Sequence, residues 1–529
     1  MQVSRRSFLK GSATAAAAGV VGATLATTNV QQAQAYFATD GDLWAIGDIA
    51  EPSETIQADM VIVGGGGTGV CAAIEAKELG LDPVVVDYGD TWGGSFVGTE
   101  GMCGINTPYT DGTADVLALT TAAMDYHHWI ANRGLILNFL NKTTETIPWL
   151  EEHGAKFGEV KKANDLGSYI HDYDHSEVTD GLMPGQIFIG HLGDTADALG
   201  VRSYFNTGGR KVLMEDGKVA GLLAEREDGS VLKIEAPAVL LAGGGYSTNE
   251  PLLRELCDVL MNDLIYSVGP QKRDGSCLKM AADCGAIMAP SPGCVQWCGP
   301  VIPGAGWQSD AFYAVLQPTL WINQDAKRFC DESMYVRDFA ATGIVQARQK
   351  RSFFIMSDAD LQNFETTGLH ATNSSVKQAG DPCPGLREVF ENLDGVYQVD
   401  TIEEAAQVLD LDEQALAKTL EEYNEYCENG VDAEFGKAAE FLNTLEGPFW
   451  VAQTQCGYYC TDGGIYVSPN LEALDANAQV IPGLYAGGCD VGGLFGDSYD
   501  FKIISCTGTG FAACSGRIAA EQINSYINA

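Results

Sequence analysis

Six small residues between two apolar segments, Gly64–Gly69, have a spacing that could position a cofactor. Gly64, Gly66 and Gly69 stand at the G-x-G-x-x-G spacing, with Gly67 and Thr68 between them. The first glycine permits a tight turn, the second lets a pyrophosphate approach the backbone, and the third lets a helix pack against a strand. Unpaired amides at the helix start would then face the phosphates. The spacing predicts a dinucleotide site.

An acidic residue follows where such a site needs one. Asp87 lies about 20 residues beyond the glycines, where a carboxylate can accept the ribose hydroxyls. The apolar runs Met60–Val63 and Pro83–Val86 predict two buried parallel strands, with a helix over Val70–Leu79 between them. Strand, helix and acid together favour a nucleotide-cofactor enzyme over a glycine-rich turn without a cofactor.

The 15 cysteines are scattered over the chain, which is not typical of a small disulfide framework. Two C-x-x-x-C pairs stand out, Cys294 with Cys298 and Cys456 with Cys460, and a cluster, a metal or a disulfide at either is an open alternative. Cluster motifs usually show closer runs, so we expect separate buried thiols and no metal site. A C-x-x-C-H haem-attachment motif is absent from the sequence.

The N-terminus resembles a twin-arginine export signal. Ser4–Lys10 contains the arginine pair, an alanine-rich apolar stretch follows, and Ala33–Ala35 is a small-residue cleavage site. We expect residues 1–35 to direct export to the periplasmic or cell-envelope side, with an uncleaved anchor as the alternative. That route carries folded proteins, which suits a chain that must acquire a cofactor first.

Composition excludes one class of partner. Lys and Arg total 31 against 71 Asp and Glu, giving a formal charge of −40. Such a surface repels phosphate backbones, so no nucleic-acid partner is expected. With 529 residues and 46% hydrophobic content, the chain can bury an ample core and suggests two or three domains.

The remaining patterns predict an α/β fold assembled from both ends of the chain. Residues 36–55 are typical of a linker, and 212–231 of an antiparallel meander. Ala238–Gly245 and Gly483–Gly488 each end an apolar strand in glycines, so both should join one parallel sheet. The middle of the chain is then an inserted domain.

Taken together, these motifs resemble the FAD-dependent flavoprotein family of soluble fumarate reductases and 3-ketosteroid dehydrogenases, from about residue 56 to 518. The marks beyond the fingerprint are Gly93–Ser95, Gly101–Met102, Pro148–Gly154, Ala242–Gly245, Asp274–Gly275, Asp283–Ala286, Asn323–Glu332, Thr461–Gly464 and Pro482–Gly488. The resemblance implies a Rossmann-like FAD-binding domain of residues 56–289 and 458–529, with an inserted α+β cap domain at 290–457.

The resemblance also implies how the cofactor is held. Succinate dehydrogenases attach FAD to a histidine near the segment matching Gly93–Ser95, and this chain has none there, so noncovalent FAD is implied. Either Cys489 or Asp490 takes the place of a family glutamate at the ribityl chain. The implied cofactor contacts are Gly64, Gly66, Gly67, Thr68, Gly69, Asp87, Gly94, Ser95, Gly101, Met102, Ala242, Gly243, Asp274 and Cys489.

In this family, hydride passes between flavin N5 and a carbon while an acid handles a proton at the neighbouring carbon. Fumarate reductases use an arginine in an N-E-x-x-x-R-D pattern. Glu332–Asp338 matches that pattern with one extra residue, which implies Arg337 as the acid and Tyr335 as its rival. A salt bridge to Asp338 or Glu332 is the alternative role for Arg337.

Departures from the family pattern bear on the substrate. Fumarate reductases hold two carboxylates with histidines in Q-T-H-P and H-H-T-M-G-G and an arginine in G-Y-N-R-L-G-G, and this chain lacks all three. A dianion is therefore disfavoured. Tyr499 resembles a ketosteroid-dehydrogenase tyrosine that handles a carbonyl or proton, with core packing as the alternative. Lys502, Cys460 and Gly463 are the candidate substrate contacts, although Lys502 could instead be solvated.

These implications define one leading hypothesis and two alternatives. The leading one is an exported flavoenzyme that reduces a small-molecule alkene conjugated to a carbonyl or carboxylate, with electrons from a separate membrane or carrier donor. One alternative is a ketone or steroid dehydrogenase running in the oxidative direction. The other is an electron-carrying flavoprotein subunit.

Overall fold

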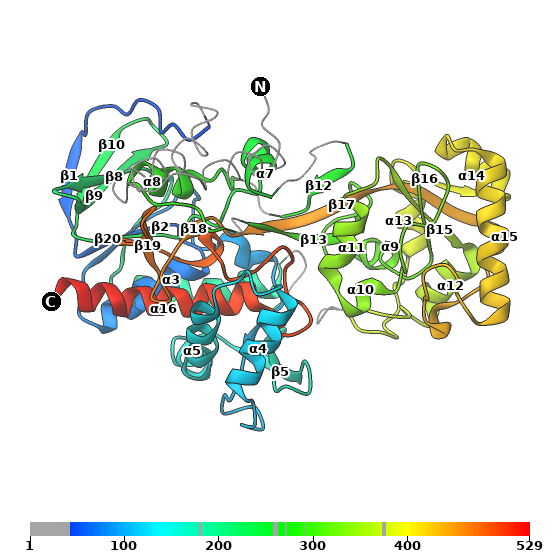
Figure 1. Ribbon diagram of the computed structural model, residues 1–529, viewed down its shortest axis with the longest axis horizontal. Coiled ribbons are helices and arrows are strands. Elements are labelled where there is room, and N and C mark those ends of the chain that lie inside the picture. The colour runs from blue at the N-terminus through cyan, green and yellow to red at the C-terminus, as the bar shows by residue number, and fades with distance from the viewer. Residues whose placement is uncertain (1–42, 179–181, 258–262, 270–271, 291–292, 373–376) are drawn as a thin grey trace, which may run out of the picture.

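The computed structural model describes residues 43–178, 182–257, 263–269, 272–290, 293–372 and 377–529. Figure 1 shows two lobes, with the cap elements α9 to α15 at one end and the C-terminus of the chain in the other lobe. The predicted signal at 1–35 lies outside the described residues. Within those residues, no helix has both the length and the apolar character needed to cross a bilayer.

A six-stranded sheet forms the centre of the first lobe, in the order β19-β20-β11-β2-β3-β7. All neighbours are parallel except β19 and β20. The predicted strands β2 and β3 are confirmed, and β20 from the end of the chain pairs with β11 as expected. The strands are β2 Met60–Val63, β3 Pro83–Val86, β7 Arg202–Tyr204, β11 Val239–Leu241, β19 Glu472–Leu474 and β20 Val480–Ala486.

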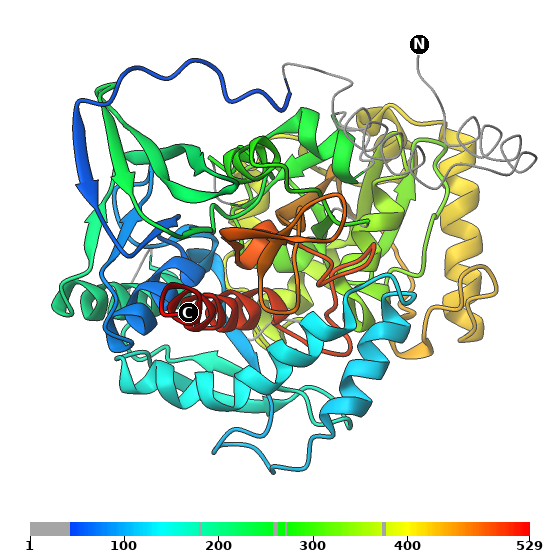
Figure 2. The same cartoon turned by 60° about the vertical axis from the view of Figure 1, so that its left-hand side comes forward.

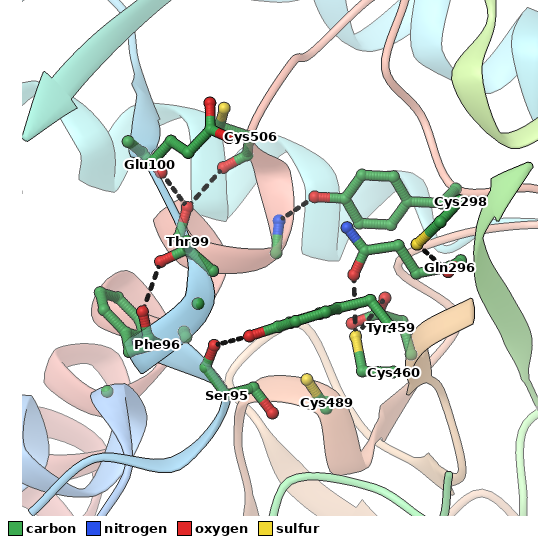
Figure 3. Close-up of a pocket in the computed structure, with 18 of the residues that line it drawn as sticks. Ser95, Phe96, Thr99, Glu100, Gln296, Cys298, Tyr459, Cys460, Cys489 and Cys506 are labelled. Carbon is green, nitrogen blue, oxygen red and sulfur yellow. Dashed lines mark hydrogen bonds between the residues drawn. The ribbon is translucent and has the colours of Figure 1, made fainter. Parts of the chain in front are cut away.

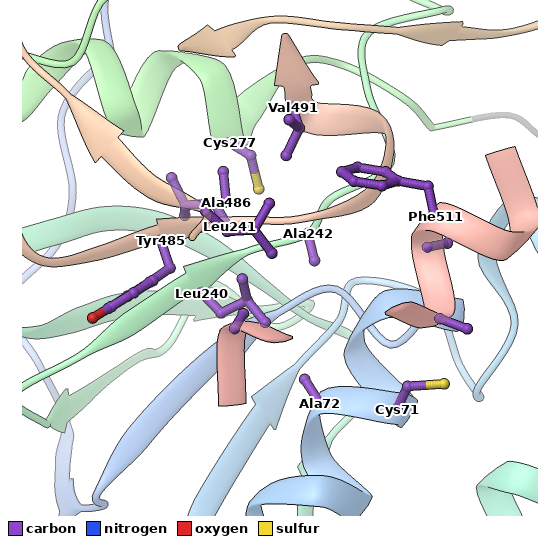
Figure 4. Close-up of a cluster of buried hydrophobic side chains, with 14 of the residues drawn as sticks. Cys71, Ala72, Leu240, Leu241, Ala242, Cys277, Tyr485, Ala486, Val491 and Phe511 are labelled. Carbon is purple, nitrogen blue, oxygen red and sulfur yellow. The ribbon is translucent and has the colours of Figure 1, made fainter. Parts of the chain in front are cut away.

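Two helices pack against this sheet and against each other. They are α3 Gly67–Glu78 and the C-terminal α16 Thr507–Ile527. A Cβ added to Gly516 of α16 would lie 2.2 Å from the Thr68 carbonyl oxygen, so the two backbones nearly touch. Figure 2 shows α16 almost end-on in the middle of this lobe. Figure 4 shows the apolar side chains of β11, β20, α3 and α16 that fill the space between them.

A second sheet confirms the predicted meander and corrects the predicted linker. Strands β8 Thr207–Glu215, β9 Lys218–Arg226 and β10 Val231–Glu235 are antiparallel. Strand β1 Glu54–Gln57 adds to β10 in parallel, so the last residues of the predicted 36–55 linker belong to a sheet. Leu43, Trp44 and Ile46 also pack on the core, since apolar side chains in this acidic segment can be buried there.

The other elements of this lobe surround the sheet. They are η1 Gly94–Gly98, β4 Gly101–Gly104, α4 Val116–Tyr126, α5 Arg133–Glu152, β5 Phe157–Lys162, β6 Tyr169–Tyr173, α6 Pro184–Ala198, α7 Glu250–Cys257, β12 Ile265–Ser267, α8 Ser276–Asp283, β18 Ile465–Tyr466, η3 Gly488–Asp490 and β21 Val491–Gly492. Strands β4, β6 and β5 form a separate three-stranded sheet that begins with the Gly101 segment.

The cap has its own sheet and two apolar clusters of its own. Its long strand β17, Phe449–Asp462, pairs with β15, β16 and β13, and Figure 1 shows β13 and β17 running from the cap into the first lobe. The other cap elements are β13 Cys294–Val301, α9 Asp310–Val315, β14 Leu320–Asn323, α10 Met334–Arg337, α11 Phe339–Gln346, β15 Ser352–Ser357, α12 Asp358–Thr366, α13 Leu386–Asn392, β16 Val396–Val399, α14 Ile402–Leu409, α15 Glu413–Asn429 and η2 Ala439–Phe441. The limits of 290 and 457 stay a prediction.

A buried ion network holds the cap loop that follows β14. Arg328 donates two hydrogen bonds to Glu332, at 2.9 and 2.7 Å, and two to Asp432, both at 2.9 Å. Lys437 lies 3.5 Å from Glu332, and all four side chains are almost fully buried. The motif residues Arg328 and Glu332 therefore have a structural role.

We expect Asp432→Ala to destabilise the cap by about 3–5 kcal/mol, because it leaves Arg328 buried with one carboxylate partner fewer. Urea unfolding followed through the buried Trp321 and Trp450 measures this. The matched control is Glu422→Ala, which breaks the exposed pair with Lys418 on α15 and should cost below about 0.5 kcal/mol. Equal losses in the two variants would contradict a special role for the network.

Candidate active site

A large cavity lies between the two lobes and encloses about 1820 Å³ of empty space, its open mouth included. One end is formed by the glycine-rich turn and Asp87, and the other by the cap and the end of β17. Figure 3 shows the region where Ser95, Thr99 and Glu100 face Gln296, Tyr459 and Cys460.

The glycine turn has the geometry that its spacing predicts. Gly64 has a φ of +110°, and a Cβ there would lie 2.1 Å from the Ala242 carbonyl oxygen. A Cβ on Gly69 would lie 1.9 Å from the Gly64 carbonyl oxygen. Helix α3 can therefore lie this close to the end of β2 only because residue 69 has no side chain. The helix begins at Gly67, three residues before the predicted start, which places Gly66, Gly67 and Thr68 on the cavity.

Polar groups along this end fit FAD. Asp87 accepts hydrogen bonds from the amides of Gly65 and Gly89, both 2.6 Å, and still lines the cavity. Ser95 Oγ and Arg273 Nε are buried there without a hydrogen-bond partner among the described residues. Buried polar groups normally have partners, so these atoms are suited to a ligand. Arg273 also supplies a positive charge suited to a diphosphate.

The structure brings most of the predicted cofactor contacts to the cavity. The lining includes Gly66, Gly67, Thr68, Asp87, Gly94, Ser95, Gly101, Ala242, Gly243 and Cys489. Four predicted cofactor contacts do not line the cavity. Of these, Gly64 and Gly69 allow the tight turn itself, and Met102 is buried within β4.

Asp274, the fourth of these, was predicted to contact the cofactor, but it does not line this cavity. Its exposed carboxylate accepts the Ser276 amide at 2.9 Å at the start of α8, outside this cavity. The neighbouring Arg273 faces the cavity instead.

Cys489 and Asp490 lie differently with respect to the cavity. Asp490 is fully buried and accepts the amides of Gly243 at 2.5 Å and Gly245 at 2.9 Å. It therefore fixes the glycines that end β11. Cys489 lines the cavity.

Aromatic side chains form the cap side of the cavity. Trp307 stacks on Tyr459 with ring centroids 5.0 Å apart and contacts Phe312 at 4.9 Å. Trp307 Nε1 donates to the Gly98 carbonyl at 3.1 Å, and the Tyr459 hydroxyl donates to the Ser95 carbonyl at 2.8 Å. These bonds join the cap to the first lobe and give the cavity a flat apolar wall.

Two predicted tyrosines reach the cavity with different hydrogen bonding. The Tyr499 hydroxyl accepts the Gly508 amide at 2.9 Å, in the first turn of α16. Burial, with the charge of Asp462, raises the pKa of Tyr499 well above its usual range, so the hydroxyl stays protonated. The Tyr335 hydroxyl donates to the Ala371 carbonyl and accepts from Gln317, so its proton is already committed.

Three other predicted site residues do not line the cavity: Arg337, the candidate acid, and Lys502 and Gly463, two candidate substrate contacts. The Arg337 side chain is 66% exposed and pairs with Asp331, which confirms an ion pair but with a different partner from the two expected. The Lys502 side chain is exposed, and the backbone amide of Lys502 donates a hydrogen bond to Asp500 at 2.8 Å. Gly463 donates its amide to the Cys489 carbonyl at 2.9 Å. We therefore do not propose Lys502 or Gly463 as direct substrate contacts, and Arg337 is no longer the leading candidate for the acid.

The two C-x-x-x-C pairs are separated by strand geometry. Cys456 and Cys460 both lie on β17, and Cys294 and Cys298 both lie on β13. Residues four apart on a strand are about 13 Å apart, so neither pair can form a disulfide or share a metal. Instead, Cys460 lies beside Asp462 and Cys489. Burial raises the pKa of Asp462 to about 6.

Several lining residues were not predicted. Glu100, which accepts hydrogen bonds from Gln308 and Tyr313, precedes the predicted Gly101 by one residue. Arg273 likewise precedes Asp274, so adjacency to a motif was the available signal. Trp307 lies in no motif, and only the fold places it.

Comparisons with known proteins agree with this geometry. The chain is 27% identical to vinyl phenol reductase of Lactiplantibacillus plantarum, over 88% of this chain and 96% of that protein. It is 25% identical to urocanate reductase of Eggerthella lenta, over 86% and 72%. The structure of 3-ketosteroid delta1-dehydrogenase from Sterolibacterium denitrificans has a TM-score of 0.72 at 18% identity, covering 89% of this chain and 99% of that one.

Two family models also match the chain. The model of the twin-arginine translocation pathway signal matches residues 2–22, which supports export by that pathway. The model of the FAD binding domain matches residues 59–500, most of the chain. The chain therefore belongs to the FAD binding domain family and is an FAD-dependent oxidoreductase.

Proposed function

We propose that the chain is an exported reductase of a carbon-carbon double bond conjugated to a carbonyl or carboxylate. The observation that carries the proposal is Tyr499, whose protonated hydroxyl lines the cavity shared by the FAD-binding turn and the cap. The reductases of vinyl phenol and urocanate among its relatives support reduction as the direction. Bound FAD supplies the hydride.

Tyr499 supplies the proton in this proposal. Its oxygen accepts the Gly508 amide, and it donates no hydrogen bond to a described residue. The positive end of the 21-residue helix α16 faces that oxygen and stabilises negative charge left after proton transfer. Arg337 and Tyr335 remain the rival donors to be tested.

The lining favours a flat, weakly charged substrate. Its acidic residues are Asp87, Glu100, Asp172 and Asp462, against the basic Lys161 and Arg273. Lys161 is paired with Asp172 at 2.6 Å. A dianion would meet excess negative charge, whereas an aromatic ring could stack on the wall formed by Trp307 and Tyr459. An aryl-substituted alkene suits this cavity better than fumarate.

The decisive experiment begins with anaerobically reduced protein. On mixing with enones, aryl-acrylates, vinyl phenol or fumarate, we expect an aryl-substituted alkene to reoxidise the flavin at least ~10-fold faster than fumarate, the size of one lost charged contact. Absorbance of the oxidised flavin gives the rate. If no alkene reoxidises the flavin but a protein electron carrier does, the chain is an electron-carrying subunit. Flavin reduction by a saturated ketone would instead support a dehydrogenase.

The electron donor is a separate membrane or carrier protein in this proposal. The sequence contains no motif for a covalently attached c-type haem that could deliver electrons internally. A donor on the exported side then reduces the flavin before each alkene is bound.

A further inference from the structure

Two cysteine thiols and one carboxyl group lie close together at the wall of the cavity, where β17 ends. Cys460 and Asp462 lie two residues apart on β17, so their side chains project from the same face. Cys489 comes from η3, 27 residues further along the chain from Asp462. One sulfur from each cysteine and one Asp462 oxygen lie within 4.8 Å of one another. Figure 3 shows Cys460 and Cys489 near Tyr459.

This arrangement lacks a positive partner among the described residues. Asp462 is 6% exposed, and its hydrogen-bonding neighbours are the two thiols. Buried carboxylates are normally paired with a cation or coordinate a metal. Either protons or a bound cation must balance these groups.

The donor set has the spacing of metal ligands. Bonds of about 2.3 Å to sulfur and 2.0 Å to oxygen at a tetrahedral angle place the two ligand atoms about 3.5 Å apart. The Cys460 sulfur lies 3.8 Å from Asp462 Oδ2. Two thiolates and a carboxylate suit a borderline cation such as Zn²⁺ rather than Mg²⁺ or Ca²⁺.

We propose that Cys460, Asp462 and Cys489 bind one divalent transition-metal ion, with Zn²⁺ the best fit, and leave its fourth position open to the cavity. Gln296 Oε1 accepts a hydrogen bond from the Cys460 thiol at 2.8 Å. With the ion bound, this oxygen can either coordinate the ion at the fourth position or accept a hydrogen bond from a ligand there. The cysteine spacing in the sequence indicates no such set, because the ligands come from two distant segments.

The open position gives the ion a role that rests on the proposed function. Cys460, Asp462 and Cys489 all line the cavity that the proposed substrate would enter. A cation there would accept the carbonyl or carboxylate oxygen of the substrate and draw electron density from the conjugated double bond. The metal site itself does not depend on that role.

The test measures metal content in the full-length, FAD-loaded protein. Wild type isolated anaerobically and incubated with Zn²⁺ should retain about one ion per chain after desalting, with two sulfur neighbours at about 2.3 Å by X-ray absorption. Cys460→Ala and Cys489→Ala should each lower the retained zinc at least ~10-fold, because the loss of even an outer-shell partner lowers metal affinity by about 10–100-fold. Cys298→Ala is the matched control, since this buried cavity cysteine lies outside the set.

Two results would overturn the site. One is wild type that retains no zinc under these conditions. The other is a Cys460–Cys489 disulfide in the peptide map of the isolated protein. The wild-type measurement decides even if a variant fails to fold, and FAD content identifies that failure. Zinc retention without alkene reduction would refute the proposed function but leave the metal site intact. Alkene reduction by protein that retains no zinc would refute the metal site but leave the proposed function intact.

Discussion

Tyr499→Phe is expected to give a yellow, FAD-loaded protein whose alkene reduction is slower by at least ~100-fold, the usual scale for losing a positioned acid. The substitution removes the hydroxyl but keeps the ring, which packs on Phe495 at 4.8 Å and Phe501 at 4.6 Å between centroids. The rate at which an alkene reoxidises the anaerobically reduced flavin measures the effect. Rapid chemical reduction of the flavin should remain unchanged.

The rival donors provide the controls for this experiment. Tyr335→Phe should retain most activity, because that hydroxyl is bonded to Ala371 and Gln317. Arg337→Ala should also stay within a few-fold of wild type, since its guanidinium is exposed and paired with Asp331. A ~100-fold loss in Arg337→Ala with normal turnover in Tyr499→Phe would transfer the proton-donor role to the arginine.

Gly66→Val is expected to yield folded protein that has lost FAD affinity by roughly 100-fold, the upper end of a 1–3 kcal/mol overpacking cost. Gly66 has an ordinary φ of −79°, and an added Cβ would find its nearest atom, Gly94 Cα, at 3.7 Å. The protein can therefore hold the side chain, but its methyl groups occupy space beside the cofactor cavity. Titration of the apoprotein with FAD measures the loss.

Gly190→Val is the matched control for this variant. Gly190 is exposed on α6, and an added Cβ there meets nothing within 4 Å. FAD affinity should be unchanged in this protein. Unaltered FAD affinity in Gly66→Val would place the diphosphate elsewhere, whereas loss of circular dichroism would mean that the turn cannot accept any side chain.

The sequence predicted the FAD-binding lobe well because local rules define it. The strands Met60–Val63 and Pro83–Val86, the glycine turn and Asp87 all lie within 30 residues, where apolar runs and glycine positions determine the geometry directly. The pairing of β11 with β20 was also predictable, since each apolar run ends in glycines.

The substrate end was harder to predict because it depends on contacts between distant segments. One inserted residue next to Arg337 was enough to make its orientation uncertain, and the structure places Tyr335 on the cavity instead. The cysteines show the same limit. Their sequence spacing pairs Cys456 with Cys460, but strand geometry separates these two and brings Cys460 to Cys489.

The late position of β20 and α16 in the chain fixes when the protein can mature. Two elements that follow β20 complete the cavity, with Cys489 from η3 and Thr509 and Ala512 from α16, so a nascent chain that lacks them has no complete FAD site. At about 5–20 residues per second, translation of 529 residues takes roughly half a minute to two minutes. The arginine pair leaves the ribosome long before α16, so export should be delayed until α16 has emerged and FAD has bound.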